Sequence, residues 1–329
     1  MTILVTGTTS AVGYFIAKQL KGENKGKEIR ALIRSEKPPK HLDELGLSFV
    51  KGDLLDRESL DKALEEIETV YHVAGEAREN IPAEQYYDVN HKGTINILES
   101  FVKNGGKYFL HVSTVGVYGH RPPSGRIKED APKKTTHPYH RSKWLGEQEV
   151  FSYSKKNNFF ASAVRPPYIM GPRDRQMAPK LFEFLLQEKS IPLINGGKCQ
   201  LSFVHHKDVA RALIMCKKSE KANGEAFNVS GGEITVEELF DTLGEISQKE
   251  PQYLRINYYV AYFLGMISEA IAKITKTKPK ITRRRVMQFT ISRIYDMSKI
   301  KQLVGFEPQY TVKEALEDAY NWMKKEKLV

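Results

Sequence analysis

Two residues with the types and spacing for proton transfer stand near the middle of the sequence. Tyr139 and Lys143 are four residues apart at the start of a segment with helical spacing, which puts both side chains on one helix face, one turn apart. A phenol beside an ammonium has its pKa lowered toward the working range, so Tyr139 can give a proton to the oxygen that develops when hydride reaches a carbonyl. A tyrosine and a lysine at this spacing are also common on solvated helix faces. The prediction of this chemistry therefore depends on finding a cofactor site elsewhere in the chain.

Two hydroxyl side chains that could hold the substrate oxygen follow a strand-like segment at residues 108–112. They are Ser113 and Thr114, and we expect them at the C-terminal edge of a parallel sheet, where ligands bind in such folds. A hydroxyl can instead satisfy the backbone of its own turn, and that must hold for at least one of the two.

The first thirteen residues have the pattern of a dinucleotide site. An apolar strand at residues 3–5 leads into a turn with Gly7 and Gly13. These glycines let the backbone turn tightly and let the following helix approach, so that its N-terminal N–H groups can bind a pyrophosphate. Ser10 stands where the central glycine of the usual pattern would be and is small enough for close approach. An ordinary glycine turn between a strand and a helix is the alternative.

The end of the second expected strand predicts which dinucleotide binds. An acid here would accept hydrogen bonds from a free ribose 2′-hydroxyl, but residues 29–33 are followed by Arg34, whose charged fork suits a phosphate. NADP is therefore favoured over NAD, with a solvated surface arginine as the alternative. Asp53, after the third strand, could accept a hydrogen bond from the adenine amino group or cap the next helix.

Short apolar runs and helical segments alternate through the first half of the chain. This predicts an α/β fold with a doubly wound parallel sheet and helices on both faces. The strands are expected at residues 3–5, 29–33, 47–50, 70–73, 108–112 and 160–164, and the helices at 12–20, 57–67 and 90–104.

A second unit is expected after residue 165, where four prolines in a short span interrupt regular structure. Strand-like segments at 201–204 and 226–229, with a helix at 209–217 between them, could return to the first sheet. We therefore predict a dinucleotide-binding domain of residues 1–170 plus 201–230, and a smaller, helix-rich C-terminal substrate domain of residues 171–200 plus 231–329.

The composition sets broad limits on the class of protein. The 329 residues are 40% hydrophobic and 28% charged, which excludes a wholly disordered, collagen-like or disulfide-scaffold chain. The chain has only two cysteines, Cys199 and Cys216. We therefore expect no metal site, and we expect the protein to reside in a reducing compartment. The N-terminus lacks a signal-peptide pattern and no apolar run reaches a span of ~18 residues, so a cytoplasmic location is expected. The net charge of +11 would attract phosphates or anionic surfaces.

An apolar segment at residues 258–267 stands next to a strongly basic one at 273–285. The first is apolar nearly all round, so it should be buried, face a hydrophobic substrate or touch a membrane. Peripheral membrane contact through residues 258–285 is one prediction, and a buried helix beside a solvated loop is the other. DNA or RNA binding is not expected, because no stacking aromatics alternate with the basic residues. The seven basic residues are Lys273, Lys276, Lys278, Lys280, Arg283, Arg284 and Arg285.

Signatures spread over nearly the whole chain resemble those of the extended short-chain dehydrogenase/reductase family, which includes NAD-dependent epimerases and dehydratases. They lie at residues 6–13, 52–54, 71–75, 88–94, 113–119, 139–143, 165–167 and 203–205. Within the family, the chain is most similar to the branch of 3β-hydroxysteroid dehydrogenases and dihydroflavonol reductases. The resemblance implies a Rossmann fold and a nicotinamide dinucleotide.

The resemblance also implies a role for each matched position. Tyr139 would be the proton donor, Lys143 the group that tunes its pKa and binds the nicotinamide ribose, and Thr114 the hydroxyl that polarises the carbonyl. Ser10 and Gly75 depart from the usual glycine and alanine, and both are sterically tolerable. Besides Tyr139 and Lys143, the cofactor would contact Gly7, Thr9, Ser10, Ala11, Val12, Gly13, Arg34, Asp53, Leu54, Val73, Ala74, Gly75, Asn90, Val112, Ser113, Pro166, Pro167 and Tyr168.

Three features favour an oxidoreductase of hydrophobic substrates over a nucleotide-sugar enzyme. By the same resemblance, dehydratases carry an acidic pair directly after the catalytic hydroxyl, where this chain has Val115 and Gly116, and sugar-nucleotide enzymes carry an arginine where Leu201 and Ser202 stand. Epimerases generally hold NAD. We therefore expect an NADP-dependent enzyme that interconverts a carbonyl and an alcohol on a steroid-, flavonoid- or lipid-like substrate. The alternatives are an NAD-dependent nucleotide-sugar epimerase or dehydratase, and a non-catalytic NADP-binding regulator; a homodimer is left open.

Overall fold

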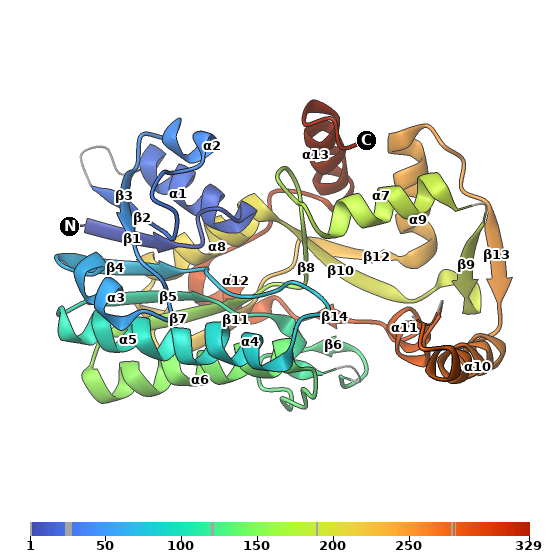
Figure 1. Cartoon of the computed structure of the whole chain (residues 1–329), viewed down its shortest axis with the longest axis horizontal. Coiled ribbons are helices and arrows are strands. Elements are labelled where there is room, and N and C mark those ends of the chain that lie inside the picture. Colours follow the sequence, from blue (N-terminus) through green and yellow to red (C-terminus); the bar gives the residue numbers. More distant parts are fainter. Residues whose placement is uncertain (1, 24–27, 120–121, 189, 278, 280) are drawn as a thin grey trace.

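A seven-stranded parallel sheet forms the centre of the molecule (Figure 1). The computed structural model describes residues 2–23, 28–119, 122–188, 190–277, 279 and 281–329. The sheet order is β3-β2-β1-β4-β5-β7-β11, and the order reverses between β1 and β4. Its strands are β1 (Thr2–Thr6), β2 (Ile29–Ile33), β3 (Ser48–Lys51), β4 (Ile67–His72), β5 (Tyr108–Val112), β7 (Phe160–Arg165) and β11 (Glu225–Asn228). The predicted doubly wound fold is confirmed.

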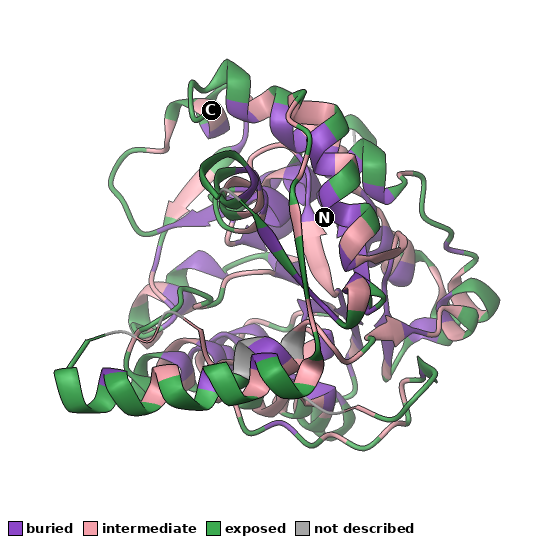
Figure 2. Ribbon diagram, turned by 90° about the vertical axis from the view of Figure 1, so that its right-hand side faces the viewer, coloured by how far each residue is buried: buried purple, intermediate pink, exposed green. Residues whose placement is uncertain are grey.

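Alternate side chains of each strand enter two separate cores, one on each face of the sheet. Ile3 and Val5 pack with α1 (Ala11–Glu23) and α8 (His206–Lys218). Leu4 points the other way, into the core formed with α3 (Arg57–Ala63), α5 (Gly93–Lys103) and α6 (Pro138–Asn157). Figure 1 shows α3, α5 and α6 grouped along the lower side of the sheet and apart from α1 and α8, and the strands are largely buried in Figure 2.

The second unit is built on a small sheet, β12-β10-β8, which three helices cover. Its strands are β8 (Tyr168–Met170), β10 (Gln200–His205) and β12 (Gly232–Thr235), and its helices are α7 (Met177–Gln187), α9 (Val236–Ser247) and α13 (Val312–Lys325). Two strand pairs complete the unit: β9 (Ile191–Ile194) with β13 (Tyr253–Ile256), and β6 (Arg126–Ile127) with β14 (Ile294–Tyr295).

The remaining elements are short or connect these layers. They are the helices α2 (Lys40–Asp43), α4 (Ala83–Tyr87), α10 (Tyr258–Thr275), α11 (Arg283–Gln288) and α12 (Ser298–Val304), the 3₁₀ turns η2 (Val115–Tyr118), η3 (Asn195–Gly197) and η4 (Glu220–Ala222), and the π-helix η1 (Asp88–Lys92).

The two strand-like segments after residue 200 have different places in the structure. The segment 226–229 returns to the first sheet as β11, which pairs with β7. The segment 201–204 does not, because its strand β10 pairs with β8 in the small sheet. Pro166 and Pro167 lack the N–H groups that would continue the main ladder, so the chain leaves that sheet after β7 and β8 starts a new one. The domain boundaries stay a prediction.

Two predicted helices differ from the observed ones. The helix expected at 57–67 ends at Ala63, because β4 already begins at Ile67 and Glu66 turns the chain with a positive φ of 63°. The helix expected at 90–104 starts with η1, a single π-helical segment, before α5 continues regularly. Segments of this kind are common at functional sites, and η1 packs against α6, the helix that carries Tyr139 and Lys143.

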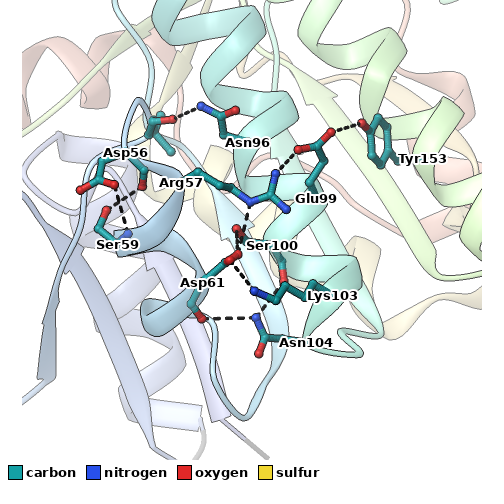
Figure 3. A network of polar contacts seen from close by, with 11 residues as sticks. Asp56, Arg57, Ser59, Asp61, Asn96, Glu99, Ser100, Lys103, Asn104 and Tyr153 are labelled. Carbon is teal, nitrogen blue, oxygen red and sulfur yellow. Dashed lines mark hydrogen bonds and ion pairs between the residues drawn. The ribbon is translucent and has the colours of Figure 1, made fainter.

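A polar network links α3, α5 and α6 on the solvent side of their layer (Figure 3). Asp61 accepts a hydrogen bond from Lys103 at 2.6 Å, and Arg57 lies 3.2 Å from the same carboxylate. Hydrogen bonds from the side chains of Lys103, Ser100 and Arg57 hold the pKa of Asp61 well below its usual range. Arg57 also pairs with Glu99, which accepts a hydrogen bond from Tyr153 at 3.1 Å. Solvent screens these contacts, so they set the spacing of the helices more than they stabilise the fold.

A buried chain of hydrogen bonds joins β1, β4 and α5 where the strand order reverses. Thr6 Oγ1 accepts from the N–H groups of Val73 and Ala74 at 3.1 and 3.0 Å, and lies 2.9 Å from His72 Nδ1. His72 Nε2 lies 3.2 Å from Thr94 Oγ1. Burial lowers the pKa of His72 to about 3, so the ring is neutral and can accept at Nδ1 while it donates at Nε2. Every polar atom of this chain therefore has a partner.

Replacing Thr6 by Val should destabilise the fold, because the N–H groups of Val73 and Ala74 and one nitrogen of His72 lose their partner. At about 1–3 kcal/mol for each unpaired buried group, we expect a loss of at least about 2 kcal/mol in urea unfolding. Thr6→Ser keeps the hydroxyl and serves as the control, with a smaller loss. Equal losses for the two variants would show that the hydroxyl does not hold this junction.

Candidate active site

The turn between β1 and α1 needs glycine at both predicted positions. Gly7 has a φ of +68°, and a Cβ atom there would lie 2.7 Å from the backbone nitrogen of Ala74. A Cβ atom on Gly13 would lie 2.2 Å from the carbonyl oxygen of Gly7. The first glycine lets the turn approach β4, and the second lets α1 rest on the turn.

Ser10 has a structural task at the position of the usual central glycine. Its hydroxyl donates to the Gly7 carbonyl at 2.7 Å and accepts from the Gly13 N–H at 3.2 Å, so it caps α1. Thr9 and Ser10 are exposed at the surface of the turn. The first-turn N–H groups of Ala11 and Val12 have no intrahelical acceptor, which suits an anionic group such as a pyrophosphate.

The ends of β2 and β3 carry the two side chains predicted to bind the adenosine half. Arg34 directly follows β2, is exposed, and makes no hydrogen bond or ion pair with a described residue. Asp53 accepts from the Leu55 N–H at 2.9 Å, and the cap of α3 is Asp56 instead. The alternative that Asp53 caps that helix is therefore wrong. Leu54 faces the core, so only its main chain is close to this edge.

The segment after β4 runs along the same edge, where Val73 and Ala74 are half-buried and Gly75 is exposed. Asn90 of η1 holds this segment with its whole amide: Oδ1 accepts from the Glu76 N–H at 2.7 Å, and Nδ2 donates to the Glu76 carbonyl and to Ser142 Oγ, each at 3.0 Å. The structure thus gives Asn90 a positioning role, and its contact with the cofactor stays a prediction.

Tyr139 and Lys143 lie on the first turns of α6, at the same edge of the sheet. The Tyr139 ring is half-buried, 5.9 Å from the ring of Tyr86. Lys143 is 5% exposed and makes no hydrogen bond or ion pair with a described residue. Its Nζ atom lies 3.7 Å from where a Cβ atom of Gly75 would be. The same Cβ atom would lie 2.8 Å from Asn90 Oδ1, so glycine lets this segment lie close to Asn90 and Lys143. The expectation that an alanine is easily accommodated here is wrong unless the Asn90 amide shifts.

The expectation that Lys143 lowers the pKa of Tyr139 is wrong for the chain by itself. Burial raises the pKa of Tyr139 to about 12 and lowers the pKa of Lys143 to about 8. Burial disfavours the charged form of both groups, and it is the largest cause of both shifts. Tyr139 therefore holds its proton at neutral pH, as a proton donor must, and Lys143 carries its charge only below about pH 8.

The two hydroxyls after β5 differ in what they bind. Thr114 Oγ1 accepts from the Gly116 N–H at 3.1 Å, so it serves its own turn while its hydrogen can still be donated. Ser113 is 3% exposed, and its Oγ atom has no hydrogen-bond partner among the described residues. An orphaned buried hydroxyl and an unpaired buried ammonium at one edge fit a site that binds a polar ligand.

Val112 and the segment after β7 form the wall between the two sheets. Val112 and Pro166 are buried, and Pro167 and Tyr168 are half-buried. The Pro166 carbonyl accepts from the Val115 N–H at 3.2 Å, and the Tyr168 ring lies 5.4 Å from that of Phe203. The structure thus brings these predicted positions to the same edge as Ser113.

A buried ion pair between α6 and β7 was not predicted from the sequence. Arg165 donates to both carboxylate oxygens of Glu147, at 3.0 and 2.5 Å, and to Tyr118 at 2.9 Å. Glu147 raises the pKa of Lys143 and so partly opposes the effect of burial. The spacing of four between Lys143 and Glu147 was the signal available, since it puts the two side chains on one helix face.

A histidine ring occupies the space next to Gly116. A Cβ atom on Gly116 would lie 2.3 Å from Cδ2 of His140, so no side chain fits at this position unless the ring moves. Directly after Thr114, the structure thus has a buried Val115 and a glycine covered by an imidazole. In the described part of the chain, no group of three His, Cys, Asp or Glu residues could hold a metal ion.

The family follows from a match that covers most of these elements. Residues 3–230 match the model of the NAD dependent epimerase/dehydratase family. The chain belongs to this family. The resemblance to extended short-chain dehydrogenases/reductases is thereby confirmed, and the dinucleotide-binding turn, Tyr139 and Lys143 all lie within the matched residues.

Relatives of this family member span more than one kind of reaction. The chain is 27% identical over 300 residues to the Mus musculus sterol-4-alpha-carboxylate 3-dehydrogenase, decarboxylating, covering 87% of this chain and 83% of the relative. It is 27% identical over 273 residues to the N-acetyl-alpha-D-glucosaminyl-diphospho-ditrans,octacis-undecaprenol 4-epimerase of Escherichia coli O157:H7, covering 81% and 80%. The fold matches that of the Bacillus cereus UDP-glucuronic acid 4-epimerase in complex with NAD, with a TM-score of 0.77, 24% identity and 99% of each chain covered.

Replacing Tyr139 by Phe should lower turnover by at least about a hundredfold, because general acid catalysis contributes 10²–10⁴-fold. Cofactor affinity should change little. The measurement is the initial rate with a panel of hydrophobic ketones at a pH below about 8, where Lys143 is charged. Tyr86→Phe is the control, since the Tyr86 hydroxyl donates to the Arg78 carbonyl at 2.5 Å. Near wild-type turnover of Tyr139→Phe would refute its role as proton donor.

Proposed function

We propose that this chain is an NADP(H)-dependent oxidoreductase that interconverts a ketone or aldehyde and a secondary alcohol on a steroid-, flavonoid- or lipid-like substrate. Arg34 is the observation that carries the proposal. Its guanidinium is exposed directly after β2 and has no ion-pair partner among the described residues, which favours a ligand with a phosphate. Epimerisation returns its cofactor to the starting oxidation state, whereas a freely exchanging NADP suits net oxidation or reduction.

The residues at the edge of the sheet have complementary tasks in this reaction. The dinucleotide supplies or accepts hydride at the substrate carbon. Tyr139 holds the proton that the substrate oxygen takes up, since its pKa of about 12 keeps the phenol protonated. Thr114 can donate its own hydrogen to the same oxygen, because its Oγ1 already accepts from the Gly116 N–H. The Lys143 ammonium stabilises negative charge that develops there.

The packing around Gly116 argues against a dehydratase. The reaction of a dehydratase needs a second acid-base pair, and by family resemblance that pair would stand at Val115 and Gly116. Val115 is buried and the His140 ring lies against Gly116. Tyr139 thus remains the acid-base group that the site offers, which is sufficient to reduce a carbonyl.

The substrate side of the site supports a hydrophobic molecule. Leu201 and Ser202 of β10 are buried, and the Ser202 hydroxyl donates to the Arg293 carbonyl at 3.0 Å. These two positions therefore offer no cation for a diphosphate. One relative, the Mus musculus enzyme, is named for a sterol substrate, which agrees with this choice.

The nucleotide-sugar epimerase remains the second candidate, and Arg293 is the observation in its favour. Its main chain bridges to Leu201, and its N–H donates to the Gln200 carbonyl at 2.9 Å. The main chain of Arg293 thus lies beside Leu201 and Ser202, the positions where nucleotide-sugar enzymes would carry an arginine. The nucleotide that copurifies with the chain tests this: tightly held NAD would support the epimerase, and NADP or an empty site the oxidoreductase.

Replacing Arg34 by Ala should weaken NADP binding by roughly 1.5 to 3 kcal/mol, the range for a hydrogen bond to a charged group, and leave NAD binding nearly unchanged. Calorimetry with both dinucleotides measures the two affinities. Lys37→Ala removes an exposed charge from the same loop and should affect neither. Equal losses of NADP and NAD affinity in Arg34→Ala would show that Arg34 does not bind the 2′-phosphate.

A further inference from the structure

Helix α10 carries its large apolar side chains on the side that faces away from the protein. Its buried residues are the small Ala261, Gly265 and Ala272. An outer face is formed by six residues three or four positions apart, a spacing that places them in one stripe. They are Val260, Phe263, Leu264, Ile267, Ile271 and Ile274, and their exposure ranges from 38% to 82%.

The inner face of α10 packs against the rest of the protein. The apolar side chains of the outer face are therefore exposed while the helix is in its folded position. A Cβ atom on Gly265 would lie 3.0 Å from the backbone nitrogen of Arg283. Ala261 packs in a small core with Ile194 and Val286. Figure 2 shows the helix projecting along one side of the molecule with most of its length exposed. The prediction that this segment is buried is therefore wrong for its exposed apolar side chains, while Tyr258 and Tyr262 are half-buried against that small core.

The region around α10 concentrates positive charge. Residues 251–295 contain nine Lys or Arg and one acid, Glu269. That acid is paired with Arg283 at 2.8 Å. Lys273 and Lys276 are exposed at the end of the helix where the apolar stripe finishes. Lys278 and Lys280 lie outside the described residues, and Arg284 and Arg285 add their charge in the sequence, while their side chains are not described.

We propose that the outer face of α10 binds the surface of a bilayer that contains anionic lipid. The apolar stripe spans about 21 Å at 1.5 Å per residue and would enter the boundary between headgroups and acyl chains, as amphipathic interfacial helices do. The basic residues beside it would meet lipid phosphates. In the described part of the chain, no helix is long and apolar enough to cross a membrane, so the contact lies along the surface.

The charges favour lipid over a second copy of the chain as the occupant. Pairing two copies through this face would bring two strongly basic regions together, and like charges opposed across an interface are unfavourable. An anionic bilayer supplies both an apolar layer and negative charge. The proposal concerns a surface outside the catalytic edge and does not depend on which reaction the chain performs.

The test is cosedimentation of the full chain with vesicles. The vesicles are phosphatidylcholine alone, or phosphatidylcholine with about a third phosphatidylserine, at about 0.05 M and about 1 M salt, which changes the Debye length several-fold. We expect binding to the anionic vesicles at low salt, much weaker binding at high salt, and little binding to the neutral vesicles.

Two variants address the two components of the surface. Phe263→Ser with Ile271→Ser should lower the affinity for anionic vesicles at least about tenfold, because apolar burial is lost. The control is Leu55→Ser with Leu328→Ser, at positions that are 52% and 51% exposed, and it should bind like the wild type. Both pairs change exposed side chains, so their unfolding midpoints should match that of the wild type.

The charge variant is Lys273→Gln with Lys276→Gln. At about fivefold per basic residue, it should bind anionic vesicles about 25-fold more weakly. Lys155→Gln with Lys156→Gln, two exposed lysines in the last turn of α6, is the control and should bind like the wild type.

Three results would overturn the proposal. The first is no binding to anionic vesicles at low salt, and the second is binding that is equal for neutral and anionic vesicles. The third is self-association in sedimentation velocity that Phe263→Ser with Ile271→Ser abolishes while vesicle binding is absent, which would identify a second copy of the chain as the occupant.

Discussion

The hydrogen bonds of Thr6 at the end of β1 hold together the two strand ends between which the candidate site lies. Thr6 binds the backbone that follows β4 and the ring of His72, and the same ring is hydrogen-bonded to Thr94 of α5. This junction is the point where the strand order reverses, so the two neighbouring strands lead into helices on opposite faces and a crevice opens between them. Gly7 approaches Ala74 at this held end of β4, and a Cβ atom on Gly7 would lie 2.7 Å from the Ala74 nitrogen.

Helix α6, which carries Tyr139 and Lys143, is positioned from the same junction. A Cβ atom on Gly146 of α6 would lie 2.4 Å from the Asn90 carbonyl oxygen, so α6 lies directly on η1, and Asn90 binds Ser142 on the helix. Glu147 and Arg165 then tie α6 to β7 through a buried bidentate pair. This packing removes water from Lys143, which lowers its pKa to about 8. The unpaired ammonium that results is the feature of the site that most clearly requires a ligand.

Local patterns in the sequence predicted most of the elements and brought the candidate site residues to one edge of the sheet, while their roles stay predictions. Tertiary contacts determined the rest. Gly7, Gly13 and the pair Tyr139 and Lys143 depend on local geometry, so their spacing was informative. The place of β10 was not predictable from its apolar run, because such a run does not reveal which sheet it joins. The pKa of Tyr139 depends on burial by elements distant in sequence. The exposure of α10 was also not predictable, because an apolar segment is ordinarily buried. Its small residues Ala261, Gly265 and Ala272 form the inward side, so the large apolar side chains face outward.

The reaction that we propose for the chain is net hydride transfer with NADP(H). The most direct measurement is the balance between product and cofactor when the chain turns over a hydrophobic ketone with NADPH deuterated at the transferable position. We expect one oxidised cofactor per alcohol formed, with one deuterium on the carbon that carried the carbonyl. An isomerised product without deuterium, formed while the added cofactor stays reduced, would contradict it and indicate an epimerase.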